Sequence, residues 1–139
     1  MPLWTVYHPV GAFTAEDKQT LADRITDLYP SLPRFYVGII FHETQKENFF
    51  MGAKPKDNFV RIWMDHFART LPTPEAKERW VRKADEAIAP FVRDRGYDWE
   101  FHIDETPRDL WSIQGITPPP VDSEAEKKWK AENKPTPYY

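Results

Sequence analysis

The chain has 139 residues, a net charge of -3 and no cysteine, which is the profile of one globular domain without disulfide bonds or thiolate metal sites. This slightly acidic balance offers no basic surface for phosphate backbones, so we expect no nucleic-acid partner. The sequence contains no apolar run of about 18 residues and no basic-then-apolar leader, so we expect no membrane span and a cytoplasmic protein.

The first half of the chain predicts a strand, a helix and a second strand. Residues 3–8 are rich in aromatic and β-branched side chains, which is typical of a strand. Thr14 is a suitable N-cap for a helix with one apolar stripe, and Pro30 ends that helix. Residues 35–41 form a nearly continuous apolar run, which predicts a strand covered on both faces.

The second half repeats this order. Residues 59–64 predict a strand, and Thr73 precedes a proline and a glutamate in the pattern of a helix start. We expect that helix to run to Gly96, with a kink at Pro90 because proline lacks the amide that would bond back four residues. Residues 97–103 then alternate between apolar and polar side chains, as a half-buried strand does.

These patterns predict one domain over residues 2–116, built from two βαβ units at about 2–56 and 57–116. Because strands joined by a helical crossover are parallel, we expect an α/β (α+β) fold with a four-stranded mixed sheet. Both helices would cover the same face of the sheet and leave the other bare. Aromatic residues make up 15% of the chain, so we expect this bare face to be used in oligomerisation.

Residues 117–139 predict a separate proline-rich tail. A triple proline begins it, and neither a helix nor a central strand can continue through that sequence. Ser123 and Glu126 have the spacing of a capping box, which predicts a short helix to about Glu132. Trp129 is the only large apolar residue of this helix, so we expect the tail to pack on another surface, such as a neighbouring subunit.

Pro2 is the first candidate for chemistry. Removal of the initiator methionine before this small residue would leave a secondary amine at the start of a strand. Surrounding tryptophan and phenylalanine side chains would lower the pKa of that amine, because an apolar environment disfavours its charged form. An amine with a pKa near the working pH is an effective general base or acid.

A proline after the initiator methionine, a β-strand start and a doubled βαβ unit resemble the tautomerase superfamily. The stretches Pro2–Tyr7, residues 22–27 and Glu105-Thr106-Pro107 are most similar to its cis-3-chloroacrylic acid dehalogenase branch, over Pro2 to about Gly115. The resemblance implies a homotrimer, a catalytic amino-terminal proline, and neither metal nor organic cofactor. It also implies small substrates with a carboxylate and an enol, enone or haloalkene group.

The resemblance assigns further residues to the site. Arg69 falls in the loop where the family binds the substrate carboxylate, and Arg61 is a second candidate. Tyr29 stands where the dehalogenase has a histidine, and His102 stands where it has a tyrosine. We expect both to assist Pro2, since a histidine on the face of an alternating strand could polarise a carbonyl group.

Two features of the dehalogenase site are missing from this sequence. Its second arginine is replaced within Leu71-Pro72-Thr73, and its water-activating glutamate falls at Ile113 or Gln114. Hydrolytic dehalogenation needs an activated water, whereas tautomerisation needs only the amine and a bound, polarised carbonyl. The sequence therefore favours a tautomerase acting on a small 2-keto acid or enol. A cis-3-haloacrylate dehalogenase or hydratase, and a non-catalytic trimeric binding protein, are the alternatives.

The remaining histidines and a pair of glutamates have simpler interpretations. The spacing of His8, His42 and His66 matches no zinc motif, so we interpret them as structural. Glu43 and Glu105 occupy equivalent places in the two repeats. That equivalence favours a role in turns over a pair of catalytic carboxylates.

Overall fold

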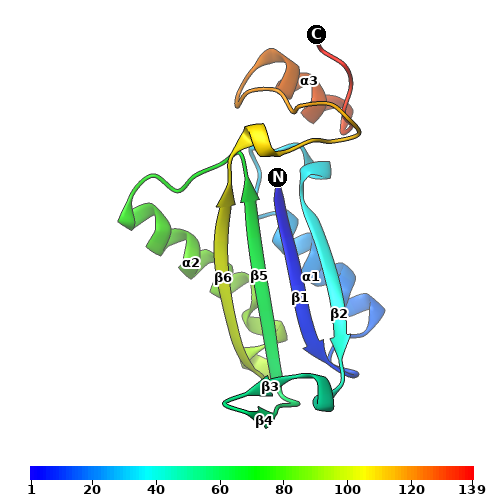
Figure 1. The fold of residues 1–139 in the computed structure, drawn as a ribbon, viewed down its shortest axis with the longest axis vertical. Coiled ribbons are helices and arrows are strands. Elements are labelled where there is room, and N and C mark those ends of the chain that lie inside the picture. Colours follow the sequence, from blue (N-terminus) through cyan, green and yellow to red (C-terminus); the bar gives the residue numbers. More distant parts are fainter.

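The computed structural model describes all residues 1–139 and contains a four-stranded sheet with two helices behind it (Figure 1). The sheet order is β2-β1-β5-β6, with β1 at Pro2–Pro9, β2 at Gly38–Thr44, β5 at Phe59–Phe67 and β6 at Asp98–Thr106. Strand β1 pairs parallel with β2 and antiparallel with β5, which pairs parallel with β6. The predicted mixed sheet of two βαβ units is confirmed.

Helix α1 (Ala15–Thr26) begins where the capping residue predicts. The Thr14 hydroxyl accepts a hydrogen bond from the Asp17 amide, and the Asp17 carboxylate accepts one from the Thr14 amide, each at 3.0 Å. This reciprocal pair satisfies two amides that have no partner within the helix. Leu21 and Ile25 on its inner face are buried against the sheet.

Helix α2 (Pro74–Ile88) is capped by Thr73, whose hydroxyl accepts a hydrogen bond from the Ala76 amide at 3.1 Å. It ends earlier than predicted. Pro90 lies in a 3₁₀ turn that follows α2, and the chain reverses at Gly96, whose φ of 78° is left-handed. The proline therefore ends the α-helix instead of kinking its last turn.

The second predicted strand is shifted along the sequence. The segment Arg34–Tyr36 forms a 3₁₀ turn, and β2 begins only at Gly38. Tyr36 leaves the sheet because its ring is fully buried in a separate cluster. Strand β2 is also an edge strand with one uncovered face, where Ile40 is 46% exposed, so the prediction of a strand covered on both faces is wrong within one chain.

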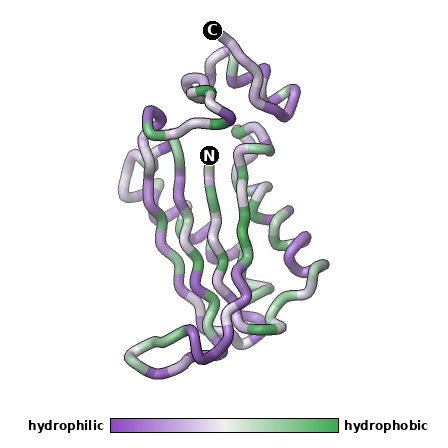
Figure 2. The backbone as a smooth tube through the Cα atoms, turned by 45° about the vertical axis from the view of Figure 1, so that its right-hand side comes forward, coloured by the Kyte–Doolittle hydropathy of each residue, from purple (hydrophilic) through white to green (hydrophobic).

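The main core lies between the sheet and the two helices, where alternate residues of β1 and β5 are buried. Its most buried members are Trp4, Val6, Leu21, Ile25, Val60, Ile62, Met64, Ala84, Ile88 and Val92. Figure 2 shows hydrophobic residues interspersed with hydrophilic ones along the strands and helices. The opposite sheet face carries exposed Tyr7 and Trp63. None of the helices is both long enough and apolar enough to cross a membrane.

The tail folds back onto its own chain. Helix α3 (Glu124–Glu132) covers the end of the sheet where β1 begins (Figure 1). Trp129 is fully buried there against Leu32, Tyr36 and Trp111. The surface that the tail was expected to need is therefore supplied by the same subunit.

Short elements complete the chain. A hairpin of β3 (Phe50–Met51) and β4 (Lys54–Pro55) extends beyond the opposite end of the sheet (Figure 1). The 3₁₀ helices are Arg34–Tyr36, Lys46–Asn48, Ala89–Phe91, Arg93–Arg95 and Arg108–Leu110.

Candidate active site

A cavity of about 200 Å³ lies at the start of β1 and brings together three of the four predicted site residues. Pro2 comes from β1, Tyr29 from the turn after α1, and Arg69 from the loop after β5. His66 and Trp80 also line the cavity, next to apolar residues from the turn after α1. The mostly apolar wall of the cavity therefore contains the guanidinium of Arg69, the phenol of Tyr29 and the first residues of the chain.

The chain terminus is held against β5. The Met1 amine donates a hydrogen bond to the Phe67 carbonyl at 2.7 Å, and the Met1 carbonyl accepts one from the Phe67 amide, also at 2.7 Å. Burial, followed by the nearby Arg69 charge, lowers the pKa of the Met1 amine to about 5. An amine in this position is therefore largely neutral at physiological pH.

Tyr29 has two hydrogen-bonding partners, His66 of the cavity wall and Trp4 of the core. Its hydroxyl accepts a hydrogen bond from the Trp4 indole nitrogen at 2.9 Å and lies 2.8 Å from the His66 Nε2. Burial lowers the pKa of His66 to about 4 and raises the pKa of Tyr29. The imidazole is therefore neutral at pH 7, and in the tautomer protonated on Nδ1 its Nε2 accepts a hydrogen bond from the Tyr29 hydroxyl.

His66 is a site residue that the sequence analysis missed. Its ring also packs against Trp80, with centroids 5.3 Å apart, and the residue is 6% exposed. The usable signal was the sheet register, since Pro2 pairs directly with His66 across β1 and β5. Sequence spacing alone does not give that register, so His66 was interpreted only as structural.

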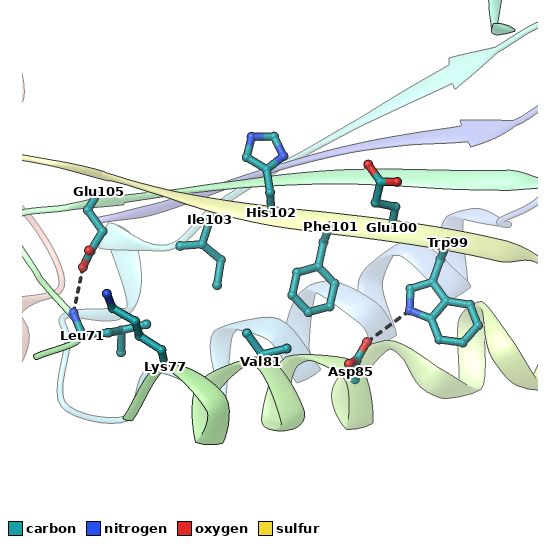
Figure 3. A pocket seen from close by; sticks show the side chains of 10 residues that line it. All are labelled: Leu71, Lys77, Val81, Asp85, Trp99, Glu100, Phe101, His102, Ile103 and Glu105. Carbon is teal, nitrogen blue, oxygen red and sulfur yellow. Dashed lines mark hydrogen bonds between the residues drawn. The ribbon is translucent and has the colours of Figure 1, made fainter. Parts of the chain in front are cut away.

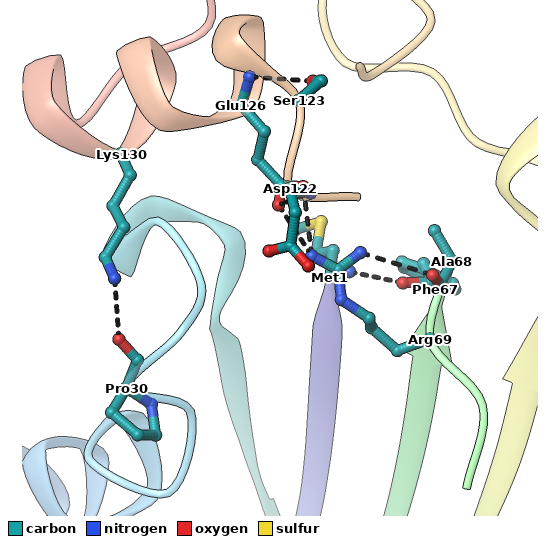
Figure 4. Close-up of polar contacts among 9 residues, drawn as sticks. All are labelled: Met1, Pro30, Phe67, Ala68, Arg69, Asp122, Ser123, Glu126 and Lys130. Atoms are coloured by element: carbon teal, nitrogen blue, oxygen red, sulfur yellow. Dashed lines mark hydrogen bonds and ion pairs between the residues drawn. The ribbon is translucent and has the colours of Figure 1, made fainter. Parts of the chain in front are cut away.

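Arg69 is joined to the tail by an ion pair (Figure 4). Its Nη2 lies 2.9 and 3.1 Å from the two carboxylate oxygens of Glu126, and its Nη1 donates to the Ala68 carbonyl at 3.3 Å. Glu126 was expected to close the capping box of α3. The Ser123 hydroxyl does accept from the Glu126 amide, but the Glu126 carboxylate turns to Arg69 and to the Asp122 amide instead.

His102 is not part of this cavity in its own chain. Figure 3 shows it on the side of β6 that faces away from α2, together with Glu100, while Phe101 and Ile103 point toward the helix. Its ring stacks on Trp63, with centroids 5.7 Å apart, and its Nδ1 contacts the guanidinium of Arg61. Arg61 likewise lies on the open face, where it pairs with Glu100 at 3.2 Å.

The two repeat-related glutamates hold loops in place. Glu43 accepts a hydrogen bond from the Gly11 amide at 2.8 Å, and Glu105 accepts one from the Leu71 amide at 2.7 Å (Figure 3). Both roles agree with their interpretation as turn residues. Glu105 thereby fixes the loop that leads from Arg69 to α2.

A larger groove of about 570 Å³ runs between α2 and β6 (Figure 3). Phe101 and Val81 supply its apolar lining, and Asp85 accepts a hydrogen bond from the Trp99 indole nitrogen at 3.1 Å. It contains neither Pro2 nor an arginine. The smaller cavity is therefore the better candidate site.

A doubled βαβ sheet with a proline beside a small cavity at its first strand defines a protein of the tautomerase superfamily. The family described as "putative oxalocrotonate tautomerase enzyme" matches residues 1–134, and the chain belongs to this family. No curated protein matches the sequence significantly.

Solved structures share this fold. The chain is 48% identical to RhCC from Rhodococcus jostii RHA1, with a TM-score of 0.94 over 98% of this chain and 99% of that one. It is 38% identical to a protein of the thermophilic fungus Aspergillus fumigatus described as a probable enzyme, with a TM-score of 0.93 over 99% and 98% of the two chains. The protein N1, of the cis-3-chloroacrylic acid dehalogenase family, shares the fold at 19% identity, with a TM-score of 0.72 over 94% and 97%.

Proposed function

We propose that the protein is a tautomerase that transfers a proton on a small 2-keto acid or enol substrate, with the amine of Pro2 as general base and acid. The observation that carries the proposal is the burial of Pro2 in a cavity that also holds Arg69 and Tyr29. Removal of Met1 would free the Pro2 nitrogen at the wall of this cavity. The reaction needs no other group to accept or return the proton.

The expected protonation state of the amine follows from its surroundings. Burial is the main cause of the low pKa of the Met1 amine, and the apolar side chains near it belong equally to the neighbourhood of Pro2. A neutral Pro2 amine would take the proton from the enol oxygen of the substrate. The resulting ammonium would return that proton to the carbon at the other end of the conjugated system.

Arg69 would bind the substrate carboxylate. Its Nη2 and Nη1 are engaged with Glu126 and Ala68, while its Nε has no hydrogen-bond partner. The Nε–H can therefore donate to one carboxylate oxygen of a substrate in the cavity. Tyr29, held by Trp4 and His66, would polarise the substrate carbonyl by turning its proton from the imidazole toward the substrate oxygen.

We also propose a homotrimer. Fused 4-OT proteins with this fold form trimers, at 18–22% identity to this chain. The open sheet face, with exposed Ile40 and Trp63, offers the surface for such an assembly. An assisting role for His102 would require this face to meet the cavity of a neighbouring subunit, because His102 does not line the cavity of its own chain.

The alternatives differ in what they require. Dehalogenation would need an activated water, and the expected position for the activating glutamate holds Ile113 or Gln114. A non-catalytic binding protein is favoured by one observation, which is that Arg69 is already neutralised by Glu126. A tautomerase would show activity that is lost when Pro2 is replaced, whereas a non-catalytic binding protein would show no such activity.

The test is the ketonisation of phenylenolpyruvate by wild-type protein, Pro2→Ala and Pro9→Ala. Pro9 ends the same strand at its opposite end, so Pro9→Ala controls for the loss of a proline from β1. We expect Pro2→Ala to lower kcat/KM at least tenfold and Pro9→Ala to leave it near wild type. Equal rates in wild type and Pro2→Ala would exclude Pro2 as the catalyst.

A further inference from the structure

The ion pair between Arg69 and Glu126 places a carboxylate of the tail at the edge of the candidate site. The Glu126 side chain is 5% exposed and that of Arg69 is 26% exposed, so the acid is the more deeply buried partner (Figure 4). Its Oε1 also accepts a hydrogen bond from the Asp122 amide at 3.1 Å. Glu126 is therefore held in one orientation, with both oxygens directed at the guanidinium.

Helix α3 holds Glu126 there firmly. The fully buried Trp129 donates from its indole nitrogen to the Thr136 carbonyl at 2.8 Å, within the tail. Besides the Arg69–Glu126 pair, two hydrogen bonds join α3 and the residue that caps its end to the body: Lys130 donates to the Pro30 carbonyl at 3.0 Å, and the Phe35 amide donates to the Asn133 side chain at 3.0 Å (Figure 4 shows the first). Burial and hydrogen bonds fix the helix at several points, and they anchor Glu126 beside Arg69 at the edge of the site.

Three acids lie around the start of β1. Burial lowers the pKa of the Met1 amine and that of His66, and nearby acids oppose this effect: Glu126 and Asp65 at the amine, and Glu105 and Asp65 at His66. All three acids therefore act on the site. Arg69 is the only arginine or lysine that lines the cavity. Arg108 does not line it and donates to the Pro118 carbonyl at 2.7 Å.

We infer that Glu126 is a specificity-determining residue that restricts the site to substrates with a single carboxylate. This inference rests on the proposed function. Arg69 is the one cationic side chain available to a substrate carboxylate, through its Nε–H and the Nη1–H that Ala68 does not accept, and a second substrate carboxylate would find no other cationic side chain in the cavity. It would instead be repelled by the negative charges of Asp65, Glu105 and Glu126, and Glu126 is already ion-paired with Arg69.

Replacing Glu126 by glutamine removes the charge and retains the shape. The amide oxygen can still accept hydrogen bonds from Arg69 and from the Asp122 amide, so α3 keeps its contacts. Arg69 then carries a full positive charge that can serve a second carboxylate. Glu124→Gln is the matched control, because Glu124 lies on the same helix with a side chain that is 90% exposed and paired with Lys127.

The experiment compares kcat/KM for phenylenolpyruvate, a monocarboxylate, and 2-hydroxymuconate, a dicarboxylate. We expect wild type and Glu124→Gln to prefer the monocarboxylate to the same degree. We expect Glu126→Gln to shift the ratio at least tenfold toward the dicarboxylate. A ratio within twofold of wild type in Glu126→Gln, or an equal shift in Glu124→Gln, would overturn the inference.

Ligand-binding measurements test this inference independently of the proposed function, because they do not require turnover. The affinities of trans-cinnamate and cis,cis-muconate, measured by calorimetry, should show the same tenfold shift in Glu126→Gln even if the protein turns over neither substrate. If melting curves show that Glu126→Gln is unfolded, Thr70→Lys provides a second variant, since it adds a cation at an exposed residue beside Arg69. It should shift the binding ratio in the same direction, and an unchanged ratio would count against the inference.

Discussion

Buried His66 should make the stability of the protein depend on pH. The residue is 6% exposed, and its pKa is lowered from 6.5 to about 4, chiefly by burial. As the pH falls below 6.5, the unfolded chain binds a proton at this histidine while the folded chain does not. Stability is therefore complete above pH 6.5 and declines as the pH falls toward 4.

The size of the effect follows from the two pKa values. At about pH 5 the unfolded histidine is almost fully protonated and the folded one is mostly neutral. Integrating proton uptake between about pH 7.5 and about pH 5 gives a loss of about 2 kcal/mol in the free energy of unfolding. His66→Gln removes this titration, because glutamine binds no proton, while its side-chain oxygen can still accept from Tyr29.

The assay is urea unfolding at these two pH values and one fixed protein concentration, since oligomerisation would make stability concentration-dependent. Other groups titrate equally in both chains, so the difference between wild type and His66→Gln isolates His66. We expect His66→Gln to lose about 2 kcal/mol less than wild type on acidification, and His42→Gln, at an exposed histidine of β2, to behave as wild type. Parallel losses in wild type and His66→Gln would refute the buried, neutral imidazole.

Three further predictions concern the tail and the cavity. Trp129→Ala should lower the free energy of unfolding in urea by about 3–5 kcal/mol because it empties a fully buried site, whereas Tyr139→Ala, at an 82% exposed tail residue, should change it little. Equal effects would mean that α3 is not packed on the body. Tyr29→Phe should cost about 1–2 kcal/mol by leaving the Trp4 indole nitrogen and His66 without their shared partner, and a neutral result in the same assay would contradict that network. Arg69→Ala should raise KM for phenylenolpyruvate by about tenfold or more with a smaller effect on kcat, and an unchanged KM would exclude Arg69 from carboxylate binding.

Local signals in the sequence were sufficient for most of the fold. Thr14 and Thr73 cap the two long helices as predicted, because a cap depends on residues within one turn. The repeated order of strand, helix and strand implied two parallel pairs, and the sheet confirms them. Tyr36 marks the limit of this reasoning, since its aromatic ring suits a strand but is buried in a cluster formed by distant segments.

The candidate site was only partly predictable for the same reason. Pro2 and Arg69 were found from their positions in family-like motifs, and Tyr29 from its place at the end of the first helix. His66 and Glu126 enter the site through the register of β1 with β5 and through the docking of α3, which are contacts across 64 and 57 residues of sequence. His102 has the side-chain alternation that was predicted, but the open face to which it points is not the wall of the Pro2 cavity within one chain.

The protonation of the Pro2 nitrogen tests the account most directly. Intact mass spectrometry first establishes whether Met1 is removed, and ¹⁵N NMR of proline-labelled protein then follows the Pro2 nitrogen through a pH titration. We predict a free secondary amine whose pKa lies below about 8, the ordinary value of an α-amino group, because burial disfavours its charge. An amide signal, or an amine whose pKa lies well above about 8, would contradict the proposed role of Pro2 as the catalyst.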